Sequence, residues 1–376
     1  MPLRSHDESS QREVGVTPAI TNQHPTLLYV AAILILGGLL TYGVYLWGFG
    51  VTGEDPGRPL TIGILAIPQV PEADAGFKEK IAELGYTNVT FLEEVFVPGP
   101  TFYEDSKKTA REMIERNVDL IFADYETQAK AALDATTELS RSDIPVIFIS
   151  RLHDPIRFGL IEGLQSSGNN ATGVAADIVG LVERHFYFIL EIKSDAKKLG
   201  AFTKGFQIPS IADEYFEEIK RQAPRFGFSV VEYMTDAPPP DAKAEFDRIA
   251  ATIKKGDIDA IMHVGGHYYA TQEAGESELA IRLGIPMATN WEDIPRGGHF
   301  TFSNGTRESG EQAAVMADKI LRGSKPADIP VEYAQKAMLS LHLGRAGEAG
   351  FEFPESMLFI AENKFDNDSF PAFEDH

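Results

Sequence analysis

Short apolar runs alternate with longer amphipathic stretches along most of this chain. Leu60–Ile67 is a continuous apolar run of strand length, and Glu72–Leu84 then places Phe77 and Ile81 at helical spacing before Gly85. Near-continuously apolar strands that alternate with helices of about 10–15 residues are typical of parallel sheets covered on both faces. We therefore expect strands at 89–95, 119–123, 145–149, 199–203, 229–234, 260–264, 286–288 and 299–302. We expect helices at 103–116, 127–140, 178–192, 212–226, 241–255, 271–283 and 307–322.

This alternation forms two sets of similar size, divided by the Gly- and Asn-rich stretch Ser166–Gly173. A single hydrophobic core rarely grows beyond about 250–300 residues, and the chain after position 58 exceeds that size. We predict the α/β class, with two doubly wound parallel-sheet lobes. In such sheets ligands bind beyond the carboxyl ends of the strands, so we expect a binding site in the cleft between the lobes.

One long apolar segment precedes the lobes. Thr26–Gly50 contains no charged residue, and a helix of about 20 apolar residues crosses a hydrocarbon core about 30 Å thick. Leu27 and Trp47 lie near its two ends, and aromatic rings favour the headgroup layer. We expect an uncleaved transmembrane anchor at residues 26–50. A cleaved signal peptide is the alternative, although its apolar region is usually about 7–15 residues long and ends at a small-x-small site.

Charge asymmetry around this segment predicts its orientation. Arg4 and Arg12 precede it, whereas Arg58 is the only basic residue soon after it. Basic residues prefer the cytoplasmic side of a membrane, so we expect a single-pass protein with a cytoplasmic N-terminus and an extracytoplasmic body. A polar leader (1–25) and a Gly/Pro linker (51–59) flank the segment.

Composition and motifs exclude several kinds of chemistry. A formal net charge of −22 argues against nucleic-acid binding, which needs basic patches. The chain has no cysteine, so it has no disulfide, thiolate site or lipid-modified cysteine. It has no P-loop, no G-x-S-x-G and no H-E-x-x-H motif. We expect no metal, no cofactor and no enzymatic activity, although the loop carboxylates Asp124 and Glu126 leave an acid–base enzyme open.

Several short motifs occur in the order found in one bacterial family. Leu321–Pro330 (LRGSKPADIP) resembles a phrase common in that family. The other motifs are Gly76-Phe77-Lys78 with Leu84-Gly85-Tyr86, Val118–Ile121, His153-Asp154-Pro155, Asn170–Val174 and Phe353–Leu358. Over residues 60–360 the chain resembles ABC-transporter substrate-binding proteins, in the group whose best-known members look like tryptophan or aromatic amino-acid binders.

The resemblance implies a type I periplasmic-binding fold with a three-segment hinge. The first lobe would comprise residues 60–173 and 305–328, the second residues 174–304 and 329–360, and an acidic tail would follow at 361–376. It also implies a bacterial protein with a periplasmic body, an amino-acid-like ligand and an ABC permease as partner. The family is normally exported free or held by a lipidated cysteine, so the expected helical anchor, which would place this protein in the inner membrane, departs from the family. Two turns also differ from the family. Pro68-Gln69-Val70-Pro71 stands where the family often has a His-Pro or Glu-His turn, and Asp124-Tyr125-Glu126-Thr127 stands where it has small residues. We expect Asp124 and Glu126 to repel an anionic ligand there.

Residues that follow the strands are the candidates for the ligand site. They are Gln69, Tyr125, Thr127, Ser150, Arg151 and His153 in the first lobe, and Lys204, His267, Tyr268, Asn290 and Trp291 in the second. Arg151 could pair with a ligand carboxylate through its planar fork, or form an ion pair with Asp154 or Glu162. Trp291 could stack on a ligand ring, or pack beside Pro295. The Gly265–His267 turn could hold a ligand or be a plain tight turn, and we expect His185 and His263 to be core residues.

Two functions fit these observations. The first is a membrane-anchored solute-binding protein that captures a small ligand between two lobes for an ABC transporter. The second is a structural or accessory subunit of a larger membrane complex. In that case Gly37, Gly38 and Gly43 would offer a small surface for packing against partner helices. The overall resemblance favours the first function, and the altered turn with the helical anchor favours the second.

Overall fold

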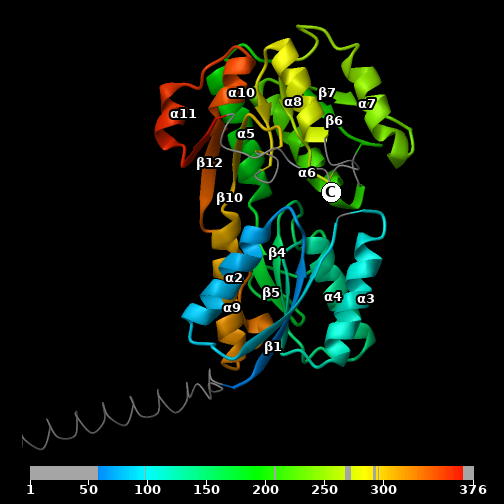
Figure 1. The fold of residues 1–376 in the computed structure, drawn as a ribbon, viewed down its shortest axis with the longest axis vertical. Helices are drawn as coiled ribbons and strands as arrows, with labels where there is room; N and C mark the ends of the chain where they lie inside the picture. The colour runs from blue at the N-terminus through cyan, green and yellow to red at the C-terminus, as the bar shows by residue number, and fades with distance from the viewer. Residues whose placement is uncertain are drawn as a thin grey trace, which may run out of the picture. The chain divides into compact units, whose positions relative to one another are not determined.

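The computed structural model describes residues 58–97, 99–206, 209–266, 272–290, 294 and 296–366. The predicted anchor, with Leu27 and Trp47, lies outside these ranges. Within them, no helix combines the length and the apolar character needed to cross a membrane. Residues 53–376 form one compact unit, which contains two lobes, each built on its own sheet (Figure 1).

Lobe 1 has a six-stranded sheet in the order β11-β5-β4-β3-β1-β2, with every neighbouring pair parallel. Its strands are β1 (Leu60–Ala66), β2 (Val89–Val95), β3 (Leu120–Ala123), β4 (Val146–Ser150), β5 (Ala171–Ala175) and β11 (Glu332–Tyr333). Every residue of β3 and β4 is buried, as a continuous apolar run predicts for a sheet covered on both faces.

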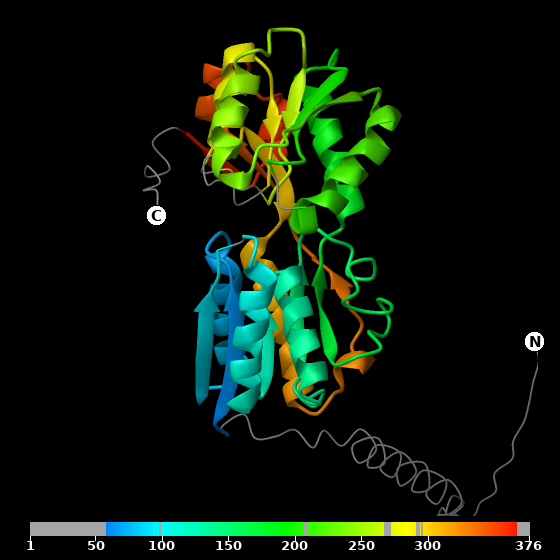
Figure 2. The same ribbon diagram turned by 90° about the vertical axis from the view of Figure 1, so that its right-hand side faces the viewer.

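Helices cover both faces of this sheet. One face carries α2 (Pro71–Glu83) and α9 (Thr306–Leu321), and the other carries α3 (Phe102–Glu115) and α4 (Glu126–Glu138). In Figure 2 the cyan and teal helices α3 and α4 stand in front of the sheet and the orange α9 stands behind it. Two glycines let α2 and α9 approach closely. A Cβ at Gly76 would lie 2.3 Å from the Arg307 carbonyl oxygen, and one at Gly310 would lie 2.0 Å from the Ala73 carbonyl oxygen.

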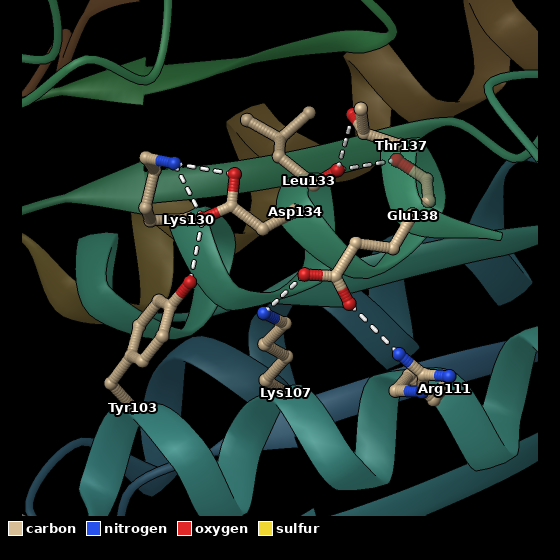
Figure 3. A network of polar contacts seen from close by, with 9 residues as sticks. Tyr103, Lys107, Arg111, Lys130, Leu133, Asp134, Thr137 and Glu138 are labelled. Atoms are coloured by element: carbon tan, nitrogen blue, oxygen red, sulfur yellow. Dashed lines mark hydrogen bonds and ion pairs between the residues drawn. The ribbon is translucent and has the colours of Figure 1, made fainter. Parts of the chain in front are cut away.

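A polar network joins α3 to α4 on the outer side of lobe 1 (Figure 3). Glu138 pairs with Lys107 at 2.5 Å and with Arg111 at 2.8 Å. Asp134 accepts a hydrogen bond from the Tyr103 hydroxyl at 2.6 Å. Burial and this hydrogen bond raise the pKa of Tyr103 above its ordinary value. The network fastens two helices that already share an apolar face, so we regard it as support for the scaffold.

Lobe 2 has a seven-stranded sheet in the order β13-β12-β10-β9-β8-β6-β7. Its strands are β6 (Lys198–Phe202), β7 (Ser229–Tyr233), β8 (Ala260–Met262), β9 (Met287–Ala288), β10 (Phe300–Asn304), β12 (Ala337–His342) and β13 (Asn363–Phe365). Its helices are α5 (Ile178–Ile192), α6 (Pro209–Gln222), α7 (Ala242–Ala250), α8 (Gln272–Leu283), α10 (Leu343–Glu348) and α11 (Glu355–Ile360). The prediction of a wholly parallel sheet is wrong here, because β12 runs antiparallel to β10.

The chain crosses between the lobes three times: after β5, between β10 and α9, and between β11 and β12. Three boundaries differ from those expected. Lobe 1 extends to Ala175 because β5 pairs along its whole length with β4. The last crossing comes after Tyr333, and not at residue 329, because β11 pairs with β5. Lobe 2 includes β13, since Asn363 pairs with Ser340 inside the stretch expected to be tail.

Candidate functional site

A small pocket lies where the three crossing segments meet. It is lined at the crossings by Ala175, Ala176, Ser303, Asn304, Thr306 and Ala334. Ser150, Arg151 and Leu152 contribute from lobe 1, and His185, Tyr215 and Asn290 from lobe 2. Its volume is about 50 Å³. An ordered water needs about 10–15 Å³ of such space, so the pocket can take the few heavy atoms of a carboxylate group.

Arg151 follows β4 and brings a cation to this pocket. Its Nε donates a hydrogen bond to the Asp124 carbonyl oxygen at 3.0 Å, which fixes the guanidinium plane. Within the described ranges its Nη2 is buried and has no hydrogen-bond partner. The ion pairs with Asp154 or Glu162 that the sequence left open are not among its contacts in these ranges. Arg151 therefore lines the pocket with a buried, unsatisfied Nη2. Its charge also acts on the nearby carboxyl groups of Asp74 and Asp124 and tends to lower their pKa values.

Glu126 holds the loop that presents Arg151. Its carboxylate is fully buried and accepts hydrogen bonds from the backbone N–H groups of Arg151 (2.9 Å) and Leu152 (3.1 Å). The same carboxylate lies 2.6 Å from His153 Nδ1. Burial alone would raise the pKa of Glu126, but the hydrogen bond and charge of His153 and the Arg151 N–H outweigh it and lower the pKa. The expectation that Glu126 faces a ligand is wrong, because loop 151–153 uses both of its oxygens.

Asp124 is buried in the same wall. Its Oδ2 accepts a hydrogen bond from the Ile67 N–H at 3.2 Å, and its side chain is 0% exposed. Burial raises the pKa of Asp124 well above its ordinary value, and the nearby charge of Asp74 raises it further. Burial likewise raises the pKa of Asp74 to about 7. The Asp124 carboxyl is not among the residues that line the pocket, so the expectation that it repels an anionic ligand stays a prediction.

The polar side chains that lobe 2 contributes to the pocket, those of His185, Tyr215 and Asn290, are neutral. The Phe302 N–H donates to His185 Nε2 at 3.1 Å, and His185 Nδ1 lies 3.2 Å from the Tyr215 hydroxyl. Burial lowers the pKa of His185 to about 4, so the ring is neutral and Nδ1 carries its proton. His263 is also buried, and it lies 3.0 Å from Glu276. Both histidines are core residues, as predicted.

Two further donors on the lobe 2 side have no partner in the part of the chain that the structure describes. They are the buried Nδ2 of Asn290 and the hydroxyl of Ser303. Asn290 packs over a glycine, because a Cβ at Gly265 would lie 2.6 Å from Asn290 Nδ2. Gly266 has a φ of 76°, in the left-handed region that favours glycine. Together with Arg151, these groups give the pocket three unsatisfied donors.

The predicted site residues fall into four groups. Ser150, Arg151 and Asn290 line the pocket. Gln69, Tyr125, Thr127 and His153 lie at the strand ends of lobe 1 and outside the pocket lining. Lys204 is exposed, with its Nζ 3.7 Å from Asp236. His267, Tyr268 and Trp291 lie outside the described residues. All eleven stay predictions as ligand contacts.

The sequence analysis missed Tyr215 and Ser303 as lining residues. Tyr215 lies on α6, so a search limited to strand ends could not find it. Ser303 belongs to β10, one residue before its end. The predicted strand ended at Phe302, two residues before the end of β10 at Asn304. With the correct end, Ser303 would have been a candidate as a residue at the carboxyl end of a strand.

Comparisons with known proteins agree with this architecture. Residues 62–365 match the family described as ABC transporter substrate binding protein. A tyrosine-binding protein of Clostridioides difficile is 22% identical over 281 residues, which cover 74% of this chain and 77% of that protein. A solved ABC domain from Streptococcus pneumoniae in complex with L-Trp has a TM-score of 0.68 at 21% identity, covering 82% of this chain and all of that one.

A ligand-free, open substrate-binding protein from Clostridium difficile has a TM-score of 0.63, also at 21% identity, and covers 82% of this chain and 98% of that one. Likeness at this level of identity shows a shared two-lobe fold. The family match extends over both lobes and all three crossings. The chain belongs to the family of ABC transporter substrate-binding proteins.

Proposed function

We propose that this protein binds a small solute with a carboxylate, or a similar planar anion, in the pocket at the lobe junction, and delivers it to an ABC permease. The observation that carries the proposal is the set of unsatisfied donors on Arg151, Asn290 and Ser303. Buried polar groups are nearly always hydrogen-bonded, so a cluster of donors without acceptors indicates a missing acceptor. A carboxylate matches the arginine fork in a bidentate way.

The size of the pocket restricts what can enter it. A volume of about 50 Å³ fits the anionic group alone, so the rest of the solute would lie between the lobes. Leu152 lines the pocket, and it belongs with Phe102 and Tyr125 to one buried apolar cluster that includes side chains of both lobes. Such surroundings suit an apolar or aromatic body. Tryptophan and tyrosine, named for two relatives, combine such a body with a carboxylate. An aromatic amino acid is therefore the first solute to test.

Thermal unfolding of the full-length protein in mild detergent tests this proposal. The panel contains aromatic amino acids, other small carboxylic acids and their neutral carboxamides. A solute at about 100 times its dissociation constant stabilises the fold by about 2.7 kcal/mol, a rise of roughly 4 °C for a chain of this size. We expect a rise with carboxylates and none with carboxamides.

Variants locate the binding site. Arg151→Gln and Asn290→Ala should lose the response to the solute, whereas Arg248→Ala, an exposed arginine paired with Glu245 on α7, should keep it. A solute that stabilises Arg151→Gln as much as the wild-type protein would refute the site. If no member of the panel stabilises the protein, carboxylate binding fails.

The apolar segment supports membrane attachment. We propose that residues 26–50 anchor the protein in the bacterial inner membrane, with the lobes on the extracytoplasmic side. The support is the uncharged run Thr26–Gly50 and the basic residues Arg4 and Arg12 before it. N-terminal sequencing of protein recovered from carbonate-washed membranes tests this. Sequence beginning near Met1 is expected, and a start after residue 50 would mean a cleaved signal peptide.

One observation favours a second function, that of an accessory subunit in a membrane complex. Ile67, Val70, Phe102, Tyr125 and Leu152 of lobe 1 belong to the same buried apolar cluster as the core of lobe 2. The protein's own side chains thus fill much of the space that a solute would need. Purification of the full-length protein from membranes, with its partners identified by mass spectrometry, separates the two functions. Stoichiometric partners other than a permease and its ATPase, together with an unresponsive ligand panel, would favour the subunit.

A further inference from the structure

The loop that carries Arg151 continues into a contact with the opposite lobe. Glu214, on α6 of lobe 2, accepts a hydrogen bond from the Asp154 N–H at 3.1 Å. Its other carboxylate oxygen lies 3.5 Å from Arg157 Nη1. The Glu214 side chain is 18% exposed and that of Arg157 is 75% exposed. We call these three residues the Glu214 clasp.

Lobe 1 folds this loop without help from Glu214. Glu126 holds residues 151–153, and the Ser150 hydroxyl donates to the His153 carbonyl oxygen at 2.6 Å. Asp154 Oδ1 then accepts hydrogen bonds from the Ile156 N–H at 2.9 Å and the Arg157 N–H at 3.1 Å. Because these contacts all lie within lobe 1, removing Glu214 should leave the loop in place and weaken only the attachment of lobe 2.

We infer that Glu214 couples solute capture at Arg151 to closure of the two lobes. Arg151 and Asp154 lie three residues apart in one loop, which is held rigidly by Glu126. A solute bound between Arg151 of lobe 1 and Asn290 of lobe 2 therefore joins the same loop to lobe 2 as the Glu214 clasp does, so each favours the closed arrangement in which the other forms. The Glu214 carboxylate makes a charge-assisted hydrogen bond to that N–H, which is stronger than a neutral one. The inference needs the proposed function for its solute, but the clasp itself forms in the protein alone.

The absence of cysteine allows a direct test of closure. Cysteines replace the exposed residues Lys108 on α3 and Ala244 on α7, one in each lobe. Both cysteines carry spin labels in the full-length protein, and pulsed electron–electron double resonance measures the distances between the labels without any ligand. We expect Glu214→Ala to move at least half of the closed population to longer distances. Glu214→Gln should have a smaller effect, because its amide oxygen still accepts from Asp154 while the charge opposite Arg157 is lost.

Matched variants exclude a general effect on α6. Glu217→Ala removes a more exposed carboxylate, 68% exposed, from the same helix, where it pairs with Lys220, and it should not change the distances. Arg157→Ala should open the lobes partly in the wild-type background and add nothing in Glu214→Ala. Circular dichroism checks that each variant is folded. Identical distance distributions in Glu214→Ala and the wild-type protein would overturn the clasp.

A second readout separates this inference from the proposed function. For a carboxylate found in the panel, Glu214→Ala should release the solute about tenfold faster, while the preference for carboxylate over carboxamide stays unchanged. Opening of the lobes with no responsive solute would remove the proposed function and keep the clasp. A solute that stabilises the protein, together with unchanged distances in Glu214→Ala, would support the proposed function and overturn the clasp.

Discussion

The two lobes bury different kinds of titratable group, and burial shifts the pKa values of these groups in opposite directions. Lobe 1 buries carboxyl groups whose pKa values are raised, with Asp74 at about 7 and Asp124 well above its ordinary value. Lobe 2 buries histidines whose pKa values are lowered, to about 4 for His185 and His342 and to about 3 for His299. Burial disfavours the charged form in every case. Acid therefore weakens lobe 2, and alkali weakens lobe 1.

Each lobe also buries a glutamate that has a histidine as its partner. Glu126 in lobe 1 and Glu276 in lobe 2 are both fully buried beside a histidine. Glu126 and His153 are 27 residues apart in the sequence, and this glutamate holds the loop that carries Arg151. Glu276 and His263 are 13 residues apart, and their contact joins α8 to the residue that follows β8. The same pairing thus orients a functional loop in one lobe and stabilises local packing in the other.

Replacing each glutamate by alanine should have the largest effect. Removing one partner of a buried pair costs about 3–5 kcal/mol, so Glu126→Ala and Glu276→Ala should both lower the midpoint of urea unfolding strongly. Only Glu126→Ala should also abolish the solute response, because Arg151 loses its support. Equal loss of binding in both variants would show that solute binding depends on overall stability and not on the support that Glu126 gives to the Arg151 loop.

Acidification should weaken lobe 2 selectively. A histidine whose pKa falls on folding adds stability above its unfolded value of about 6.5, and this stability is lost as the pH falls towards the folded value. At pH 5 the loss is about 2 kcal/mol each for His185 and His299. Hydrogen exchange at pH 5 and pH 7.5, corrected for intrinsic rates, should show faster exchange at pH 5 in β8, β9 and β10. β3 and β4 should exchange no faster at pH 5, because Asp74 adds stability to lobe 1 at the lower pH. Uniform loss of protection would contradict the comparison.

Asp74→Asn should have the opposite pH dependence. A carboxyl group whose pKa rises on folding, here from 3.8 to about 7, adds stability below about pH 4 and loses it as the pH rises through 7. The neutral amide should therefore stabilise the protein at pH 8 by about 2–4 kcal/mol and change little at pH 4. Thermal unfolding at both pH values measures this. The control is Asp105→Asn, an exposed acid in the first turn of α3, and a similar gain there would refute the explanation.

The smallest expected effect concerns the network in Figure 3. Tyr103→Phe removes a single hydrogen bond to Asp134, and such bonds contribute about 1 kcal/mol. Urea unfolding should show this loss with solute binding unchanged. A change in binding would mean that the outer helices of lobe 1 influence the junction.

Most of the fold was predictable because burial on both faces of a sheet leaves a direct trace in the sequence. The run expected at Leu60–Ile67 forms β1, and the helix expected at 178–192 matches α5. β5 left no such trace, since its sequence ATGVA has one large apolar residue. Small residues are needed there, because a Cβ at Gly173 would lie 2.1 Å from the Phe148 carbonyl oxygen.

The site was predictable only in part. The geometry of parallel strands selected Ser150, Arg151 and Asn290, which the structure brings to one pocket. It could not tell whether Glu126 faces a ligand or a loop, because that depends on the direction of two backbone N–H groups at 151 and 152. Residues contributed by a helix of the opposite lobe, such as Tyr215, depend on how the lobes close.

Calorimetric titration of one carboxylate and its carboxamide tests the central claim most directly. The best acid from the panel and its amide are each titrated into the full-length wild-type protein and into Arg151→Gln. The account predicts that the wild-type protein binds the acid at least tenfold more tightly than the amide, and that Arg151→Gln loses this preference. Equal binding of acid and amide by the wild-type protein, or a preference that survives in Arg151→Gln, would contradict it.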